Sequence, residues 1–369
     1  MQLKANLRFT NNEQAEFFST LRKRVDTYFR DNKISPYANA QMIIKSIVLL
    51  SAYFVPFFFI VFVPLPFWLL VTMWSVMGFA LAGVGMSVMH DANHGSYSSN
   101  KTINAIMGYT LNVLGGAVFN WKLQHNVLHH TYTNIVHMDE DIEDKLIMRF
   151  SPHTELKWYH KFQWVYAFFF YGILTLYWAL IKDFVQFVQY KRNGVNKNTA
   201  KQNRIVLLKI IGHKVIYFSY FFLIPCLVFN VAFLPHLYGF LWMQFIAGII
   251  LTTVFQLAHT VEGTTYPLPN EGGTIENNWA IHQMNTTVNF SRKNKFISWY
   301  VGGLNFQVEH HLFPRICHVH YPAISEIVKT TAEEYNIPYL ENKSLTDALN
   351  AHVRALKKLG LPSINEAIA

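Results

Sequence analysis

Long apolar runs alternate with polar segments along this chain, and their lengths predict helices that cross a membrane. Residues 43–63 and 67–89 are apolar runs of about 20 residues, enough for a helix to cross ~30 Å of hydrocarbon. Pro64 and Pro66 lie between the runs and predict a tight turn. The two runs therefore form a hairpin that brings the chain back to the side on which it began.

A second pair of apolar runs, at 215–234 and 237–258, repeats this arrangement. Pro235 and His236 separate the two runs and predict the second turn. We therefore predict four transmembrane helices, arranged as two hairpins.

Two further apolar stretches complicate this count. Residues 103–119 contain asparagines and three glycines, which favours a helix that lies in the membrane interface. Residues 162–181 could span on length alone, but one crossing there would put His310 on the opposite face from His90. If the histidines of the chain share one site, residues 162–181 must lie in-plane or re-entrant.

The predicted fold is an all-α integral membrane protein with interfacial helices and a cytoplasmic helical cap. Its parts are an N-terminal cytoplasmic segment at 1–42, a membrane domain at 43–369, and cap segments at 90–214 and 259–369. Helical spacing of apolar residues predicts helices over 13–29, 323–335 and 344–359.

Composition supports a membrane protein, because 14% of residues are charged whereas soluble proteins carry about 25%. Lysine and arginine are absent between Lys45 and Lys101 and between Lys214 and Arg292. Every basic residue then falls on the side that holds the N-terminus, which the positive-inside rule makes the cytoplasm. The net charge of +9 predicts a face near anionic lipid and acidic partners, with no nucleic acid. The first residues lack an apolar core, so we expect no cleavable signal peptide.

Histidines gather in three clusters, each beside an apolar run. The clusters are His90 with His94, then His125 with His129 and His130 in a predicted loop, then His310 with His311. Histidines at i and i+4 lie on one face of a helix, and imidazole is a common ligand of transition metals. The three clusters predict one polynuclear metal site, and His259 at the end of the last crossing is a further candidate ligand.

Other residues are predicted to orient these imidazoles. Asp91 and Glu309 neighbour two of the clusters, and His282 is either a ligand or a residue behind the ligands. The acidic run 139–144 is interpreted mainly as a solvated loop. His213 and His236 are given no role.

The number of imidazoles exceeds what one ion can take, so two ions are expected. Cys226 and Cys317 are too few for an iron–sulfur cluster or a cysteine zinc site. Sulfur-free imidazole ligation with open positions suits iron and oxygen chemistry better than zinc hydrolysis. Haem with two axial histidines would need them inside facing helices, and these lie at helix ends and in a loop.

The motifs HDxxH at 90–94, HxxxHH at 125–130 and QxxHH at 307–311 resemble those of the membrane fatty acid desaturases. The resemblance covers about residues 43–339. It implies a non-haem di-iron centre that uses O₂ to remove two hydrogens from an acyl chain, with the histidines of the three motifs as ligands and His259 as one more.

The third motif is similar to that of front-end desaturases, in which Gln307 replaces a histidine and can hydrogen-bond a metal-bound water. The chain has no HPGG motif, and 42 residues are too few for a fused cytochrome. It therefore most resembles bacterial linoleoyl-CoA and acyl-lipid desaturases, which favours the bacterial inner membrane over the endoplasmic reticulum.

The resemblance also implies partners. The substrate is a fatty acyl chain linked to CoA, a carrier or a lipid, and no substrate-binding residue is assigned. Electrons come from an external donor, a ferredoxin or a b-type cytochrome, because no flavin or nicotinamide motif is recognisable. The alternatives are a hydroxylase on the same scaffold, a non-enzymatic metal carrier and a zinc hydrolase.

Overall fold

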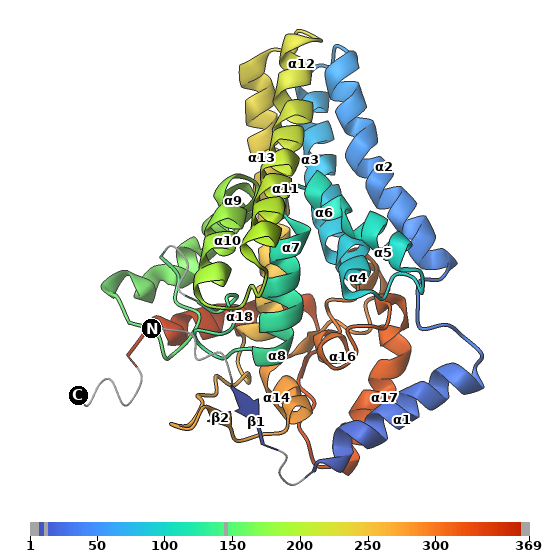
Figure 1. Cartoon of the computed structure of the whole chain (residues 1–369), viewed down its shortest axis with the longest axis vertical. Coiled ribbons are helices and arrows are strands. Elements are labelled where there is room, and N and C mark those ends of the chain that lie inside the picture. The colour runs from blue at the N-terminus through green and yellow to red at the C-terminus, as the bar shows by residue number, and fades with distance from the viewer. Residues whose placement is uncertain (1–6, 11–13, 144–146, 363–369) are drawn as a thin grey trace. The chain divides into compact units, whose positions relative to one another are not determined.

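A computed structural model of the chain describes every residue except 1–6, 11–13, 144–146 and 363–369. As predicted, the described part is mostly helical, and its strands are short pairs of two residues (Figure 1). Two compact units make up the chain. One unit comprises 1–38, 124–167 and 254–369, and the other comprises 39–123 and 168–253.

Among the described residues, five helices are long and apolar enough to cross a membrane, so the chain is an integral membrane protein. They cover Ala40–Phe62, Phe67–His94, Trp158–Arg192, Ala200–Leu227 and Phe233–His259. The third of these contains residues 162–181, which we expected to lie in-plane or re-entrant. The count of four crossings is therefore not confirmed and stays a prediction, as does the cytoplasmic cap.

The first hairpin forms as predicted, from α2 (Ala40–Phe62) and α3 (Phe67–Gly83), which run side by side in Figure 1. Pro66 is the N-cap of α3, where its missing N–H costs no helical hydrogen bond. The helix continues from α3 through the π-helical turn η1 (Val84–Val88) into α4 (Met89–His94). The first histidine cluster thus lies at the end of the second apolar helix.

The second hairpin turns earlier than predicted. The preceding helix is α11 (Ala200–Phe218), continued by η5 (Ser219–Leu223) and α12 (Ile224–Leu227). The following helix, α13 (Phe233–His259), already contains Pro235 and His236. The predicted turn at these two residues is wrong because proline is tolerated in the first turn of a helix, where it replaces an unbonded N–H.

The stretch after α4 is broken into short helices. These are α5 (Lys101–Gly108), α6 (Thr110–Val113), α7 (Val118–Trp121), η2 (Lys122–His129) and α8 (His130–Tyr132). The direction changes by 108° between Val113 and Val118. Gly115 lies in this bend with a φ of +97°, which favours glycine. The stretch is thus not one straight helix, and its place in the membrane interface stays a prediction.

The long helix between the hairpins also changes its winding along its length. Its parts are η3 (Trp158–Phe162), α9 (Gln163–Tyr177), the π-helical η4 (Trp178–Lys182) and α10 (Asp183–Arg192). Asp183 of α10 forms a buried ion pair with Lys214 of α11, with 2.6 Å between Oδ2 and Nζ. This pair ties α10 to α11 within one unit.

In the other unit, the N-terminal helix shares a core with the C-terminal helices. Helix α1 (Glu16–Asp31) packs against α17 (Tyr321–Glu334), as Figure 1 shows. Apolar side chains recur every four residues on α1 from Phe17 to Phe29 and are buried in this core. Arg24 adds a two-pronged ion pair with Glu334, with N–O distances of 2.9 and 2.7 Å.

Short elements complete this unit. They are α14 (Trp279–Thr286), α15 (Lys295–Tyr300), α16 (Gln307–Leu312), η6 (His318–His320) and α18 (Leu345–Leu359). Strand β1 (Arg8–Phe9) pairs in parallel with β2 (Thr274–Ile275), and β3 (Asn289–Phe290) pairs in parallel with β4 (Glu341–Asn342). The helices α1, α17 and α18 confirm the three helices predicted at the two ends of the chain.

Candidate metal centre

The second histidine cluster lies on a helix and not in the predicted loop. His125 and His129 belong to the π-helical η2, and His130 begins α8. The chain restarts as a helix after the bend at Gly115, which the pattern of apolar residues did not indicate. A π-helical turn adds a residue to the winding and is frequent at functional sites.

Three imidazoles from distant parts of the chain meet in one unit. His129 comes from η2, His259 from the end of α13 and His311 from α16. Their ring nitrogens include a set within 4.8 Å of one another, and the residues are 0%, 2% and 0% exposed. This arrangement can hold a metal ion.

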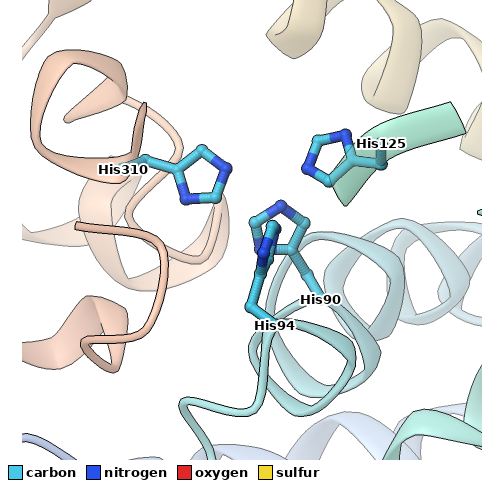
Figure 2. A group of neighbouring side chains, drawn as sticks. All are labelled: His90, His94, His125 and His310. Atoms are coloured by element: carbon cyan, nitrogen blue, oxygen red, sulfur yellow. The ribbon is translucent and has the colours of Figure 1, made fainter. Parts of the chain in front are cut away.

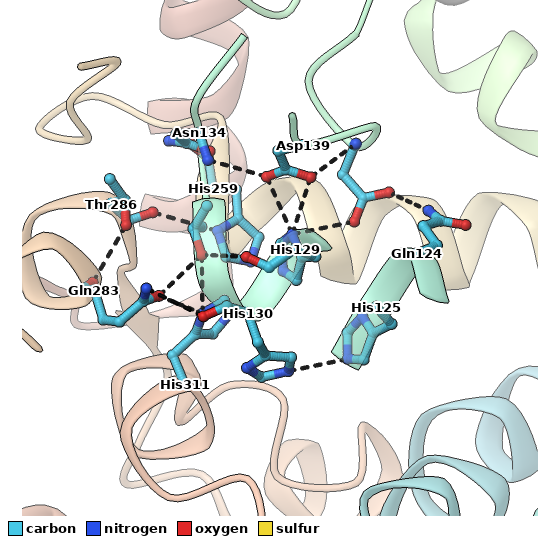
Figure 3. Close-up of polar contacts among 12 residues, drawn as sticks. Gln124, His125, His129, His130, Asn134, Asp139, His259, Gln283, Thr286 and His311 are labelled. Atoms are coloured by element: carbon cyan, nitrogen blue, oxygen red, sulfur yellow. Dashed lines mark hydrogen bonds and ion pairs between the residues drawn. The ribbon is translucent and has the colours of Figure 1, made fainter. Parts of the chain in front are cut away.

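The Nδ1 atoms of these three rings are each held by an acceptor. His129 Nδ1 donates to Asp139, 3.1 Å from both carboxylate oxygens (Figure 3). His311 Nδ1 donates to Gln283 Oε1 at 2.8 Å, and His259 Nδ1 lies 3.3 Å from the carbonyl oxygen of Thr286 (Figure 3). Because Nδ1 carries the hydrogen, each Nε2 keeps its lone pair.

These lone pairs fit a transition-metal ion. Within the described part of the chain, His311 Nε2 is buried without a hydrogen-bond partner. Burying a polar atom in this way is costly unless something binds it. Burial, and after it the neighbouring His130, hold the pKa of His311 well below its usual value, which keeps the imidazole neutral. Neutral imidazole is the form that ligates metals.

Asp139 is an exception within the acidic run, which we interpreted mainly as a solvated loop. Its residue is 0% exposed and also accepts from the backbone N–H groups of Asn134 and Asp141, each at 3.0 Å. Asp141 lies 3.3 Å from His129 Nδ1 and accepts from Gln124 at 2.8 Å. The sequence shows only a cluster of charges, and the partner ten residues upstream becomes visible only in the fold. Asp144 lies outside the described residues.

A second group of imidazoles adjoins the first within the same unit. The Nε2 atoms of His125 and His130 are 3.3 Å apart, and the rings of His130 and His310 have centroids 4.6 Å apart. The rings of His125 and His310 are nearly parallel, with an interplanar angle of 20° and centroids 5.8 Å apart, and both are drawn in Figure 2. His310 Nδ1 lies 3.2 Å from the hydroxyl of Tyr321. Six predicted ligands thus come together in this unit.

The remaining pair, His90 and His94, belongs to the other unit. The two rings project from one side of α4 with centroids 4.7 Å apart (Figure 2). Both rings also pack against the Trp121 ring, with centroids 5.7 Å away for His90 and 5.6 Å away for His94. Gly95 ends α4 in the left-handed conformation, with a φ of +76°, so the helix stops directly after His94. The Asp91 carboxylate lies 3.9 Å from His90 Nδ1.

The other residues predicted to orient ligands differ in their outcome. Gln307 Nε2 lies 3.0 Å from His259 Nε2, so its amide faces a candidate ligand. Glu309 accepts instead from Tyr339 and Asn289, each at 2.8 Å, and its expected bond to an imidazole is absent from the described contacts. A residue that precedes His310 on a helix points about 100° away from it. Burial raises the pKa of Glu309 to about 7.

The residue that holds a candidate ligand in place is Gln283 and not its neighbour His282, which the sequence had suggested. His282 packs against Phe9, with ring centroids 5.1 Å apart, and is not among the described groups of close metal-ligating atoms. Burial lowers the pKa of His282 to about 4. Gln283 instead accepts from His311 and from Thr133 Oγ1 at 2.9 Å, and its Nε2 lies 3.3 Å from the carbonyl oxygen of His130. We did not predict Gln283, because an amide beside a histidine carries no signal of its own.

Comparisons with known proteins agree with the motifs. The model of the family described as fatty acid desaturase matches residues 66–343. The chain is 36% identical to an acyl-lipid (8-3)-desaturase of Physcomitrium patens over 97% of this chain and 74% of that protein. It is 35% identical to an sn-1 linoleoyl-lipid 6-desaturase of Arthrospira platensis, over 95% of both chains. A protein of that name from Synechocystis is 34% identical, over 97% of this chain and 98% of that protein.

Proposed function

This chain belongs to the fatty acid desaturase family, and from that premise we propose that it introduces a double bond into the acyl chain of a membrane lipid at a histidine-ligated, non-haem di-iron centre. It is an oxidoreductase of lipid metabolism. The lipid-linked substrate is supported by the names of its relatives, which are acyl-lipid and linoleoyl-lipid desaturases. The glutamine of the third motif supports front-end placement of the double bond.

The buried triad of His129, His259 and His311 is the observation that carries the proposal. Its lone pairs, and the acceptors that fix each ring, suit a divalent transition metal. The full proposed ligand set is His90, His94, His125, His129, His130, His259, His310 and His311. Including His90 and His94 rests on the order and spacing of the family's motifs.

This set of histidines would hold two iron ions, which when bound would supply the chemistry for oxidising a methylene group with O₂. The chain's own contribution is orientation and the exclusion of water. Asp139 and Gln283 fix the rings of His129 and His311, and the triad is almost wholly buried. In this structure Gln307 donates to the His259 nitrogen that a metal would take, so metal binding releases the amide for another acceptor.

The distribution of charge supports our proposals for the sidedness of the protein and for the face on which the electron donor docks. The proposed donor is a ferredoxin or a b-type cytochrome that docks on the face holding the basic residues. The absence of lysine and arginine from residues 46–100 and 215–291 supports a cytoplasmic position for that face. A bacterial inner membrane is the proposed location.

Replacing His129 with alanine tests the proposal. We expect His129→Ala to lose bound iron and desaturation, whereas His137→Ala, at an exposed histidine outside the cluster, keeps both. Product masses separate the reactions, since desaturation removes two hydrogens and hydroxylation adds an oxygen. Full activity and iron content in His129→Ala would remove the central assignment.

A further inference from the structure

A cavity of about 240 Å³ lies in the unit formed by residues 39–123 and 168–253, between the bent helices α6–α7 and helix α11. The polar residues that line it are Lys122, Lys209, His213 and Asn112, and no aspartate or glutamate is among its lining residues. One water needs only ~10–15 Å³ of such volume, so the cavity has room for a larger group.

The two lysines of this cavity differ in their ion pairing from Lys214, which follows Lys209 on α11. Lys214 is paired with Asp183 at 2.6 Å and donates to the carbonyl oxygen of Trp178 at 2.8 Å. Lys122 and Lys209 have no ion pair with any residue that the structure describes. The lining of the cavity therefore carries positive charge that no described ion pair balances, and such charge attracts an anion.

His213 contributes a hydrogen-bond donor even when its ring is neutral. Asn112 Nδ2 lies 2.8 Å from His213 Nδ1, and an amide NH₂ can only donate. Nδ1 is thus the acceptor, and Nε2 carries the ring hydrogen. Together with two ammonium groups, this N–H suits the oxygens of a phosphate group.

The position of the cavity along α11 indicates where the anion comes from. Basic residues occur on α11 at Lys201, Arg204, Lys209 and Lys214, and none follows through Leu227. Such a boundary between charged and apolar residues falls at the level of the lipid headgroups. The anion present at that depth is the phosphate of a phospholipid.

We propose that this cavity binds the phosphate of a bilayer phospholipid, at a site separate from the candidate metal centre. The two ammonium groups and the imidazole N–H contact its oxygens. The site sets a preference for phospholipid around the protein, whatever lipid class carries the acyl chain that reacts.

Lipid binding to the purified full-length protein in detergent tests this site. Three probes are titrated: dioctanoyl phosphatidylglycerol, dioctanoylglycerol without phosphate, and glycerol 3-phosphate without tails. A basic residue near a lipid surface contributes about 1 kcal/mol, so Lys122→Gln with Lys209→Gln should weaken phosphatidylglycerol binding about 30-fold. Lys197→Gln with Lys201→Gln removes the same charge outside the cavity and should change it less than twofold.

Replacing both cavity lysines with arginine should keep the binding, and this variant shows that any loss in the glutamine pair follows from charge and not from misfolding. Unchanged affinity in the glutamine pair would overturn the site. Equal binding of dioctanoylglycerol would overturn the role of phosphate, and equal binding of glycerol 3-phosphate would overturn the lipid source. Iron content, measured in the same preparations, reports separately on the metal assignment.

Discussion

Replacing Asp139 with asparagine is the sharpest test of how the candidate centre is held. The carboxylate accepts from three donors: His129 Nδ1, the Asn134 N–H and the Asp141 N–H. An amide keeps one oxygen and brings an NH₂ group, so at least one of these donors faces another donor. If His129 loses its acceptor, the ring hydrogen can move to Nε2, the atom proposed to bind metal.

The expected loss can be estimated from partners of this kind in other metal sites. Removing the partner of a ligating histidine usually costs 10–100-fold in metal affinity or activity, about 1.4–2.7 kcal/mol. We expect Asp139→Asn to fall within this range, because Asp139 is fully buried and both of its oxygens lie 3.1 Å from His129 Nδ1.

Competition with a soluble chelator measures iron affinity on the purified protein, and fatty acid profiles of expressing cells measure desaturation. Glu143→Gln makes the same chemical change in the same acidic run, at a side chain 30% exposed that pairs with His137, and should leave both unchanged. An Asp139→Asn protein that unfolds at the wild-type temperature and binds iron within twofold of wild type would refute the reasoning.

Two other predictions concern stability, and thermal or denaturant unfolding in detergent checks both. A Cβ at Gly108 would lie 2.6 Å from Asn93 Oδ1, so Gly108→Ala should force α5 away from α4 and cost about 1–3 kcal/mol; an unchanged midpoint would contradict this close approach. Burial lowers the pKa of His352 to about 4, against a hydrogen bond to the Thr260 carbonyl that raises it. In the unfolded chain this imidazole takes up a proton near pH 6.5, whereas in the folded protein it stays neutral down to about pH 4. The free energy of unfolding is therefore highest above pH 6.5 and falls by up to about 3 kcal/mol as the pH drops towards 4. His352→Gln should flatten the dependence of stability on pH over this window, and an equally steep dependence in that variant would show that other groups cause it.

The sequence indicates the candidate ligands more directly than the residues that hold their rings in place. Histidines at i and i+4, such as His90 and His94, are recognisable in the sequence by their spacing and by the number of histidines close together. Asp139 and Gln283 are ordinary residues whose importance comes from burial next to an imidazole. No local pattern distinguishes a buried carboxylate from its solvated neighbours.

The helices likewise divide into those that the apolar pattern predicts and those that depend on the surrounding fold. Apolar length correctly predicted α2 and α3, because a lipid-facing helix needs little besides apolar side chains. The turn placed at Pro235 was wrong, since proline fits a helix start as well as a turn. The helical state of His125 was also missed, because a π-helical turn has a periodicity that neither the α-helical nor the strand pattern matches.

The triad of His129, His259 and His311 has a consequence for the order of events during synthesis. His311 leaves the ribosome only after the five described helices that are long and apolar enough to cross the bilayer have been made. No shorter nascent chain can assemble the three rings, so this triad could bind the proposed ion only after those helices have been made. A chain that terminates before α16 would keep those helices and lack one of the three proposed ligands.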